Sequence, residues 1–312
     1  YSGQAGNFNY LFSVEAEARY NYRVSKELSF DPDFTLLEAK NEESTRDQRD
    51  YQASMNLGYS FENSVIQLNA LLGTSSPPSE LERTIHDFTS NTIRLQREDN
   101  SSERDNWEVG GDYEYSLSGG GKYRFLFIVN DRESQFTRER YDVFDNSENK
   151  NLFLSNLGRD RERIARTSYT FNLNDAQGLE VGVEGSQTIR DSGLLLGLDT
   201  SGTPSPDYGN LVPVSINNSG STVEELRSEV FAAHNWQINP RMSLESSLIF
   251  ESSTIEQSGD VSNKRDFTFV RPKVDYRFDI TPSLQLRAGI EKDVSQLSFS
   301  DFSATVDNSD ED

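Results

Sequence analysis

The chain has 312 residues, a formal net charge of -22 and no cysteine, and 34% of its residues are hydrophobic. Its mean hydropathy is -0.71 and no run approaches the roughly 18 apolar residues of a spanning helix, which excludes a membrane protein built from helices. The acidic balance argues against a nucleic-acid partner, and the lack of cysteine excludes a disulfide framework and a thiolate metal site.

The first predicted element is a long strand over residues 8–24. Every second residue there is apolar or aromatic: Phe8, Tyr10, Phe12, Val14, Ala16, Ala18, Tyr20, Tyr22 and Val24. Apart from Leu11, the residues between them are polar or charged. This period-two alternation predicts a strand with one apolar and one polar face. Because its length exceeds the roughly 9 to 11 residues that a tilted strand needs to cross a bilayer, it predicts a transmembrane β-barrel.

The same alternation recurs along the chain in pairs of strands joined by short turns. The pairs are expected at 51–61 and 66–72, 107–117 and 123–129, 165–173 and 179–185, 226–238 and 242–250, and 274–278 and 284–290. With the opening strand and a partner at about 28–39, which Pro32 weakens, they make roughly twelve strands in six hairpins. The glycine run 119–121 supplies the positive φ angles of a tight turn. A change of phase around Pro272 predicts a bulge, because proline removes a ladder hydrogen bond.

Long polar connections separate the hairpins, at about 41–50, 74–104, 135–160, 191–222 and 256–266. We expect them to be loops, although residues 93–95 are equally compatible with an extended strand. Short turns at one rim and long loops at the other are typical of outer-membrane barrels, whereas long structureless loops are uncommon inside compact domains.

Aromatic and charged residues occupy opposite phases of these strands. The aromatics expected to form a belt near the short turns are Tyr20, Tyr22, Tyr59, Phe61, Tyr113, Tyr115, Tyr123, Phe125, Tyr169, Phe171, Trp236, Tyr276 and Phe278. Tyr and Trp favour the headgroup level of a membrane. The opposite phase carries mid-strand charges: Glu15, Glu17, Arg19, Asp112, Glu114, Arg124, Arg166, Glu180, Glu184, Asp275, Arg277 and Arg287. Because a Lys or Arg on a lipid face costs roughly 2 to 4 kcal/mol near the midplane, this phase is predicted to face a wet lumen or a plug.

Residues 271–302, RPKVDYRFDITPSLQLRAGIEKDVSQLSFSDF, resemble the barrel region of TonB-dependent outer-membrane receptors. The resemblance implies part of a barrel of about 22 strands, in the bacterial outer membrane and in contact with its lipid. It further implies a plug domain, coupling through it to TonB, and uptake of a scarce solute such as an iron chelate, cobalamin or glycan. This chain shows no plug, coupling box or C-terminal aromatic. We therefore expect residues 1–312 to be a single barrel region, incomplete at both ends.

No residue stands out as catalytic, cofactor-binding or metal-binding, and we expect no enzyme activity and no cofactor. The two histidines, His86 and His234, lack a second histidine at ligand spacing. Ser228 and Ser246 lie near His234 in the hairpin pattern, but no strained nucleophile turn accompanies them. The acidic tail 307–312 lacks the glycine and spacing of an EF-hand, so it is interpreted as a solvated loop.

Two other interpretations stay open at this point. One is a passive channel or a small barrel that these strands close on their own. The other is a soluble all-β binding module whose apolar phase faces a sandwich core. Strand length and the one-sided aromatic belt count against the soluble module.

Overall fold

The computed structural model describes residues 1–145, 147–294 and 299, and it is built almost entirely from strands. The strands in chain order are β1 (Ser2–Ala5), β2 (Phe8–Phe30), β3 (Leu36–Ser60), β4 (Ser64–Ser76), β5 (Ser79–Asp87), β6 (Thr92–Ser116), β7 (Lys122–Phe144), β8 (Ser147–Asn174), β9 (Gln177–Leu198), β10 (Val212–Val214), β11 (Gly220–Asn239), β12 (Met242–Gly259), β13 (Asn263–Thr281) and β14 (Leu284–Glu291). A 3-10 turn, η1 (Pro206–Tyr208), lies between β9 and β10. No helix in this part of the chain is long and apolar enough to cross a membrane.

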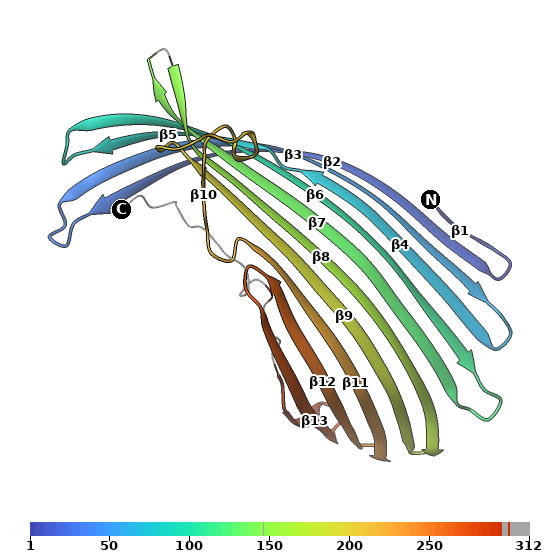
Figure 1. Cartoon of the computed structure of the whole chain (residues 1–312). Coiled ribbons are helices and arrows are strands. Elements are labelled where there is room, and N and C mark those ends of the chain that lie inside the picture. The colour runs from blue at the N-terminus through green and yellow to red at the C-terminus, as the bar shows by residue number, and fades with distance from the viewer. Residues whose placement is uncertain (146, 295–298, 300–312) are drawn as a thin grey trace.

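All strands belong to one antiparallel sheet that curves into a wall (Figure 1). Neighbours follow the order β1-β2-β3-β4-β6-β7-β8-β9-β11-β12-β13-β14, with β5 and β10 off this path. Across the described residues β1 and β14 are edges that do not pair with each other, so the sheet stays open. The all-β antiparallel fold is confirmed, whereas a small barrel closed by these strands alone is not the arrangement observed.

The second predicted strand, at 28–39, is wrong. Residues 8–30 form one strand, β2, and the chain reverses where the strand was expected. Asp31 organises this turn, because its Oδ1 accepts hydrogen bonds from the backbone N–H groups of Asp33 and Thr35 at 2.9 and 2.7 Å. Pro32 lies in the same turn, which suits its fixed φ angle.

The predicted long loops are mostly strand. Residues 41–50 lie inside β3, and the connections at 135–160 and 256–266 are largely taken up by β7 with β8 and by β12 with β13. Residues 93–95 belong to β6. Only the connection between β9 and β11 keeps a long irregular stretch, at 199–219, which contains η1 and β10. The short turns at the opposite rim are confirmed.

β4 and β5 are one strand interrupted by Pro77 and Pro78. Arg49 pairs with Ser76 and Arg46 pairs with Ser79, so β3 and its partner both advance by three residues across the break and the register is kept. The two prolines have no backbone N–H to donate, which interrupts the ladder. The carbonyl of Pro78 still accepts a hydrogen bond from the N–H of Asp47 at 3.2 Å.

The predicted bulge at Pro272 is also wrong. The pairing of β12 with β13 keeps one register from Gln257↔Asn263 to Met242↔Phe278 and includes Leu248↔Pro272. The carbonyl of Pro272 accepts from the N–H of Lys292 at 3.0 Å, so the hydrogen-bonding side of this residue faces β14. Because β14 ends at Glu291, the missing N–H falls beside the end of a strand and interrupts no ladder bond to β12.

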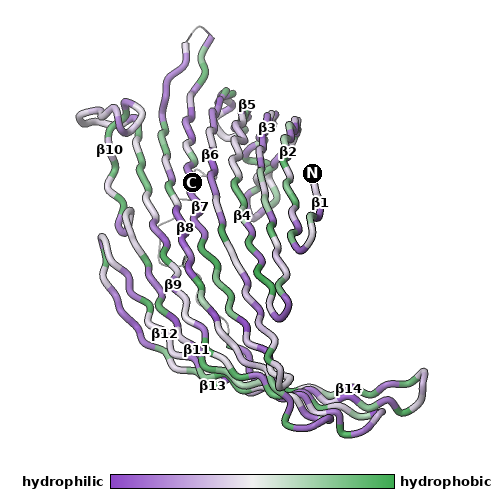
Figure 2. The backbone as a smooth tube through the Cα atoms, turned by 90° about the vertical axis from the view of Figure 1, so that its right-hand side faces the viewer, coloured by the Kyte–Doolittle hydropathy of each residue, from purple (hydrophilic) through white to green (hydrophobic). Residues whose placement is uncertain are grey.

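Register places the predicted apolar phase of every strand on one side of the sheet, which we call the apolar face. For example, Val183 lies between Thr167 on β8 and Val230 on β11, and Val230 lies beside Phe250 on β12. The other side is the polar face. It carries all the mid-strand charged residues, from Glu15 to Arg287, that the alternation predicted to lie opposite the apolar residues. Figure 2 shows the resulting alternation of hydrophilic and hydrophobic residues along the strands.

Candidate functional site on the polar face

A row of charged side chains crosses β8, β9, β11, β12 and β13 on the polar face. We call it the arginine–glutamate ladder; its members are Arg166, Glu184, Arg227, Glu229, Glu251 and Arg271. Arg271 Nη2 lies 2.8 Å from Glu229 and 2.9 Å from Glu251. Arg227 contacts two glutamates: its Nε lies 3.6 Å from Glu229, and its Nη2 lies 3.4 Å from Glu184. The ladder therefore ties five strands together through alternating charges.

The ladder lies at the level of the apolar band, by which we mean the part of the apolar face lined by residues such as Val183, Val230 and Phe250. Glu184, Glu229 and Glu251 directly follow or precede Val183, Val230 and Phe250, which point to the other face. Glu251 is 5% exposed, and the nearby Glu225 accepts a hydrogen bond from Ser253 Oγ at 2.6 Å. The Nε atoms of Arg227 and Arg271 are buried without a hydrogen-bond partner among the described residues. Buried charges are costly unless fully paired, so this face needs water or another protein surface against it.

A second charged group, the upper cluster, lies on the polar face further from the short turns. Arg83 on β5 bonds to Glu42 on β3 through Nε at 2.6 Å and lies 3.5 Å from Glu98 on β6. Arg138 on β7 donates to the same Glu98 through Nε at 3.0 Å and through Nη2. Glu98 is 3% exposed. The cluster thus clamps four strands beyond the apolar band.

A third network, which we call the tip network, joins β6, β7 and β8 at their ends far from the short turns. It lies on the apolar-face side. Arg97 forms a two-pronged bond to Glu148 at 3.0 and 2.7 Å, and its guanidinium lies 4.4 Å from the ring centre of Tyr141. The hydrogen bonds from Arg97 hold the pKa of Glu148 below its usual value. Lys150 bonds to Glu139 at 2.6 Å; burial raises the pKa of Glu139, but the bonds from Lys150 and Tyr141 outweigh burial and lower it.

The largest apolar core lies under the long connection at 199–219. Leu152 and Leu154 of β8 pack with Leu194 and Leu196 of β9, and Leu198, Val214 and Ile216 pack against them. Leu152 is 1% exposed. All four core leucines are on the polar face, so this connection covers an apolar patch at the end of the wall far from the short turns.

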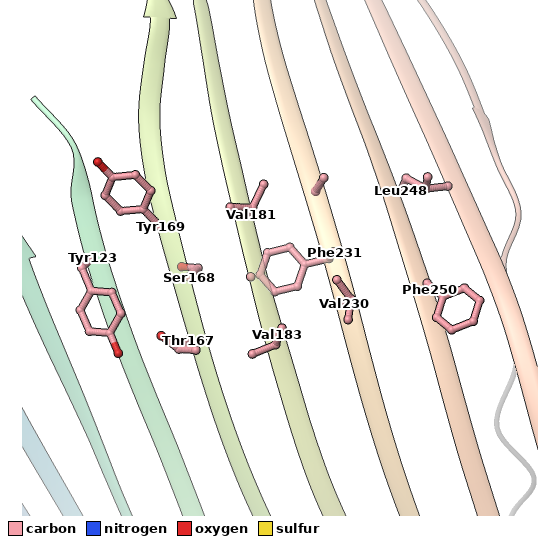
Figure 3. A pocket seen from close by; sticks show the side chains of 12 residues that line it. Tyr123, Thr167, Ser168, Tyr169, Val181, Val183, Val230, Phe231, Leu248 and Phe250 are labelled. Atoms are coloured by element: carbon pink, nitrogen blue, oxygen red, sulfur yellow. The ribbon is translucent and has the colours of Figure 1, made fainter.

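A hollow of about 580 Å³ is on the opposite, apolar face (Figure 3). Tyr123, Tyr169 and Phe250 border it, with Val181, Val183 and Val230 between them. Because this face is apolar and continuous across the strands, the hollow belongs to the lipid-facing surface and offers few polar groups to a dissolved ligand.

The aromatic belt is confirmed for the residues that lie near the short turns, such as Tyr115, Tyr123 and Tyr169, which are neighbours across β6, β7 and β8. It is wrong for Tyr20 and Tyr22. Because β2 continues to Phe30, these two lie toward the opposite rim, where the hydroxyl of Tyr22 bonds to Glu43 at 2.7 Å.

The histidines and serines considered as site residues are not brought into one site. His86 stacks on Phe88 with ring centres 6.2 Å apart. His234 Nε2 lies 3.2 Å from Gln177 Oε1, and Ser246 lies across from His234 on β12. Ser228 lies opposite Gly185. The acidic tail at 307–312 and, apart from Phe299, the LSFSDF stretch at 297–302 lie outside the described residues.

Sequence reasoning missed the upper cluster and the tip network, because residues 41–50, 74–104 and 135–160 were interpreted as loops, whereas β5 and β6 occupy most of 74–104. One signal was present: 41–50 contains no Gly or Pro, and 135–160 contains one Gly and no Pro. Loops of that length normally carry such breakers.

Residues 29–308 match the family of TonB-dependent receptor-like β-barrels. No match was found among curated proteins. Among solved structures, the alcaligin outer-membrane receptor FauA of Bordetella pertussis is similar with a TM-score of 0.41 and 8% identity, over 88% of this chain and 43% of that one. The siderophore receptor PiuA of Acinetobacter baumannii is similar with a TM-score of 0.41 and 10% identity, over 90% of this chain and 48% of that one. The chain therefore spans less than half the length of these receptors.

The family match excludes the soluble binding module as an interpretation. It also agrees with the expectation that the chain is not an enzyme, because the family consists of transporters. The chain belongs to the TonB-dependent receptor family and is an outer-membrane β-barrel region.

Proposed function

We propose that this chain is part of the wall of an importer that moves a scarce solute across the outer membrane with energy delivered through TonB. The observation that carries the proposal is the arginine–glutamate ladder at the level of the apolar band. Charges at that depth cannot face hydrocarbon, so the polar face borders a lumen. An iron chelate, cobalamin and a glycan are the candidate solutes.

In this proposal the ladder is the surface on which a plug domain rests. Its acids outnumber its bases once Glu180, 3.9 Å from Arg166, is included. The buried Nε groups of Arg227 and Arg271 supply further donors toward the lumen. A plug with both donors and acceptors would complete these bonds, and TonB would act on the wall only through that plug.

Residues 1–312 are proposed to be one barrel region that continues at both edges of the sheet. Within the described residues, β1 and β14 present unpaired backbone groups. In a bilayer each unsatisfied backbone group costs several kcal/mol, so further strands must pair with both edges.

The test is uptake by cells that express the whole receptor, with the tonB gene present or deleted. Labelled iron chelate, cobalamin and oligosaccharide are supplied in turn, and cells without the receptor give the background. Uptake of one solute that is lost on deletion of tonB is the expected result. Uptake that persists without TonB would overturn the proposal and favour a passive channel.

A further inference from the structure

β2 carries a row of apolar side chains that continues beyond the apolar band. The row lies on the side of the apolar face, which we call the outward side, and Lys26 interrupts it. We call it the outer stripe; its members are Tyr20, Tyr22, Val24, Leu28 and Phe30. All five side chains are between 44% and 70% exposed, so the described part of the chain leaves the stripe uncovered. At roughly 3.3 Å per residue, the stripe is about 33 Å long.

The strand beside the outer stripe shows that the stripe lies outside the hydrocarbon of the membrane. Tyr20 pairs with Asp47 and Val24 pairs with Glu43, so β3 presents carboxylates on the outward side at this level. Charges that face hydrocarbon are costly. The tips of the β2–β3 and β5–β6 hairpins project side by side at the rim opposite the short turns (Figure 1). Contact with lipid chains therefore does not account for the stripe.

Acidic side chains that lie directly opposite one another occupy the surface next to the outer stripe. Glu43 on β3 lies across from Glu82 on β5. Glu80 on β5 lies across from Asp99 on β6, and Asp99 lies across from Glu139 on β7. We call these five residues the outer acids. Like charges at directly opposite positions destabilise a sheet, so this surface gains from a cation.

The chain itself neutralises only part of this charge. Two of the outer acids have a cationic partner within the chain, Arg97 in one case and Lys150 in the other. Glu80 and Glu82 are exposed, and neither forms an ion pair within residues 1–145, 147–294 and 299. These two carboxylates remain available to a positive group from outside.

A hollow of about 470 Å³ lies between the outer stripe and the outer acids. It opens where Pro78 interrupts the ladder, and Tyr20 lines it together with Glu80, Asp99 and Glu139. One side of the hollow is therefore aromatic and the other carries carboxylates. A lysine or arginine side chain fits such a hollow, because its stem is apolar and its end is cationic.

We propose that the outer stripe and the outer acids dock a separate protein through a segment that carries both apolar and basic side chains. Exposed apolar surface marks interaction sites, and aromatic residues are enriched in protein interfaces. Complementary charge selects a basic partner. A second copy of this chain, whose net charge is -22, and an anionic lipid would both bring negative charge to the outer acids. The inference goes beyond the proposed function and holds for any imported solute.

The test uses the whole receptor in nanodiscs of phosphatidylcholine, a lipid without net charge. Two labelled synthetic peptides serve as probes, one in which Val and Lys alternate and one in which Val and Glu alternate. Fluorescence anisotropy measures their affinities, and empty nanodiscs give the background. We expect the Val–Lys peptide to bind at least about tenfold more tightly than the Val–Glu peptide, and to bind more weakly as salt is added.

Two double variants locate the bound peptide on the receptor. Glu80→Gln with Glu82→Gln should weaken binding of the Val–Lys peptide about tenfold, because two unpaired carboxylates are lost. Val24→Ser with Leu28→Ser should weaken it by a similar factor of about ten, because the apolar contact is lost. All four side chains are exposed, so the receptor should still fold.

Matched controls alter the outward side elsewhere. Glu256→Gln removes a carboxylate that already has Lys264 at 3.3 Å. Leu157→Ser removes an apolar side chain that is 41% exposed and lies across from Gln135. Both variants should bind the Val–Lys peptide as tightly as the unaltered receptor does.

Equal affinity for the two peptides, or binding of the Val–Lys peptide that both double variants leave unchanged, would overturn the inference. A receptor that binds neither peptide above background would also overturn it, because another part of the whole receptor would then cover the stripe. Self-association of the receptor that Val24→Ser with Leu28→Ser abolishes would replace the separate protein by a second copy. None of these outcomes involves TonB-dependent uptake, so failure of the docking inference leaves the proposed function standing.

Discussion

The half of the wall near the short turns and the half beyond the apolar band share one continuous hydrogen-bond ladder but face different surroundings. In the first half, charges are confined to the polar face, as in the arginine–glutamate ladder. In the second half both faces carry ion pairs, such as Asp131 with Arg159 at 2.6 Å on one side and Glu42 with Arg83 at 2.6 Å on the other. The difference teaches that the solvent on each face, rather than strand pairing, decides which side chains a position accepts.

The strongest test of this comparison places one charge at two levels of the same face. Val183→Arg, in the apolar band, should lower the free energy of unfolding by about 2 to 4 kcal/mol, because the guanidinium would face hydrocarbon. Gln135→Arg, on the apolar-face side beyond the band, should change it by less than about 0.5 kcal/mol. Urea unfolding of the whole receptor in lipid vesicles measures both, and equal costs would contradict the comparison.

The next effect concerns the ladder. Arg271→Gln should cost about 2 to 3 kcal/mol, because it leaves the buried Glu251 without its closest cation. Lys264→Gln is the matched control, since Lys264 and Glu256 are both mostly exposed and such pairs contribute about 0 to 1 kcal/mol. If Arg271→Gln were as mild as the control, the ladder would be hydrated rather than covered.

A smaller effect tests close packing on the polar face. A Cβ at Gly182 would lie 2.3 Å from the ring of Phe231 and 2.6 Å from the backbone oxygen of Thr167, so Gly182→Ala should destabilise by about 1 to 3 kcal/mol. Arg166 holds that ring in place with its guanidinium 4.2 Å from the ring centre. Gly185→Ala meets nothing within 4 Å and should be close to neutral. The same unfolding assay compares the two.

The smallest effect depends on pH and is confined to the tip. The pKa of Glu148 is lowered in the folded protein by its bonds to Arg97. The stabilising contribution is therefore present above the unfolded pKa of about 4.3 and is lost as the pH falls through the lower folded value. The protection factor of the Tyr141 amide against hydrogen exchange, which is corrected for the intrinsic effect of pH on exchange, should fall at pH 3 relative to pH 6, while amides of the apolar band keep their protection. Glu148→Gln should remove this pH dependence.

Sequence patterns predicted the elements of the apolar band well. Alternation in residues such as Val181, Val183, Val230 and Phe250 identified their strands and their common face, because a buried or lipid-facing row imposes period two. The polar extensions carry no such row. Arg46, Arg83 and Arg138 were therefore assigned to loops, although the structure places them on β3, β5 and β7.

The sequence by itself determined the antiparallel strands of the apolar band, their short turns, the face that meets lipid and, through the resemblance, the receptor family. Hydrophobic alternation determines these features, since a shift by one residue would turn every apolar side chain to the wrong face. Only the tertiary structure decided how far strands such as β2 and β3 continue beyond the band and which charges pair across them. Those contacts depend on register between distant segments, and polar strands in water leave no periodic trace from which to predict it.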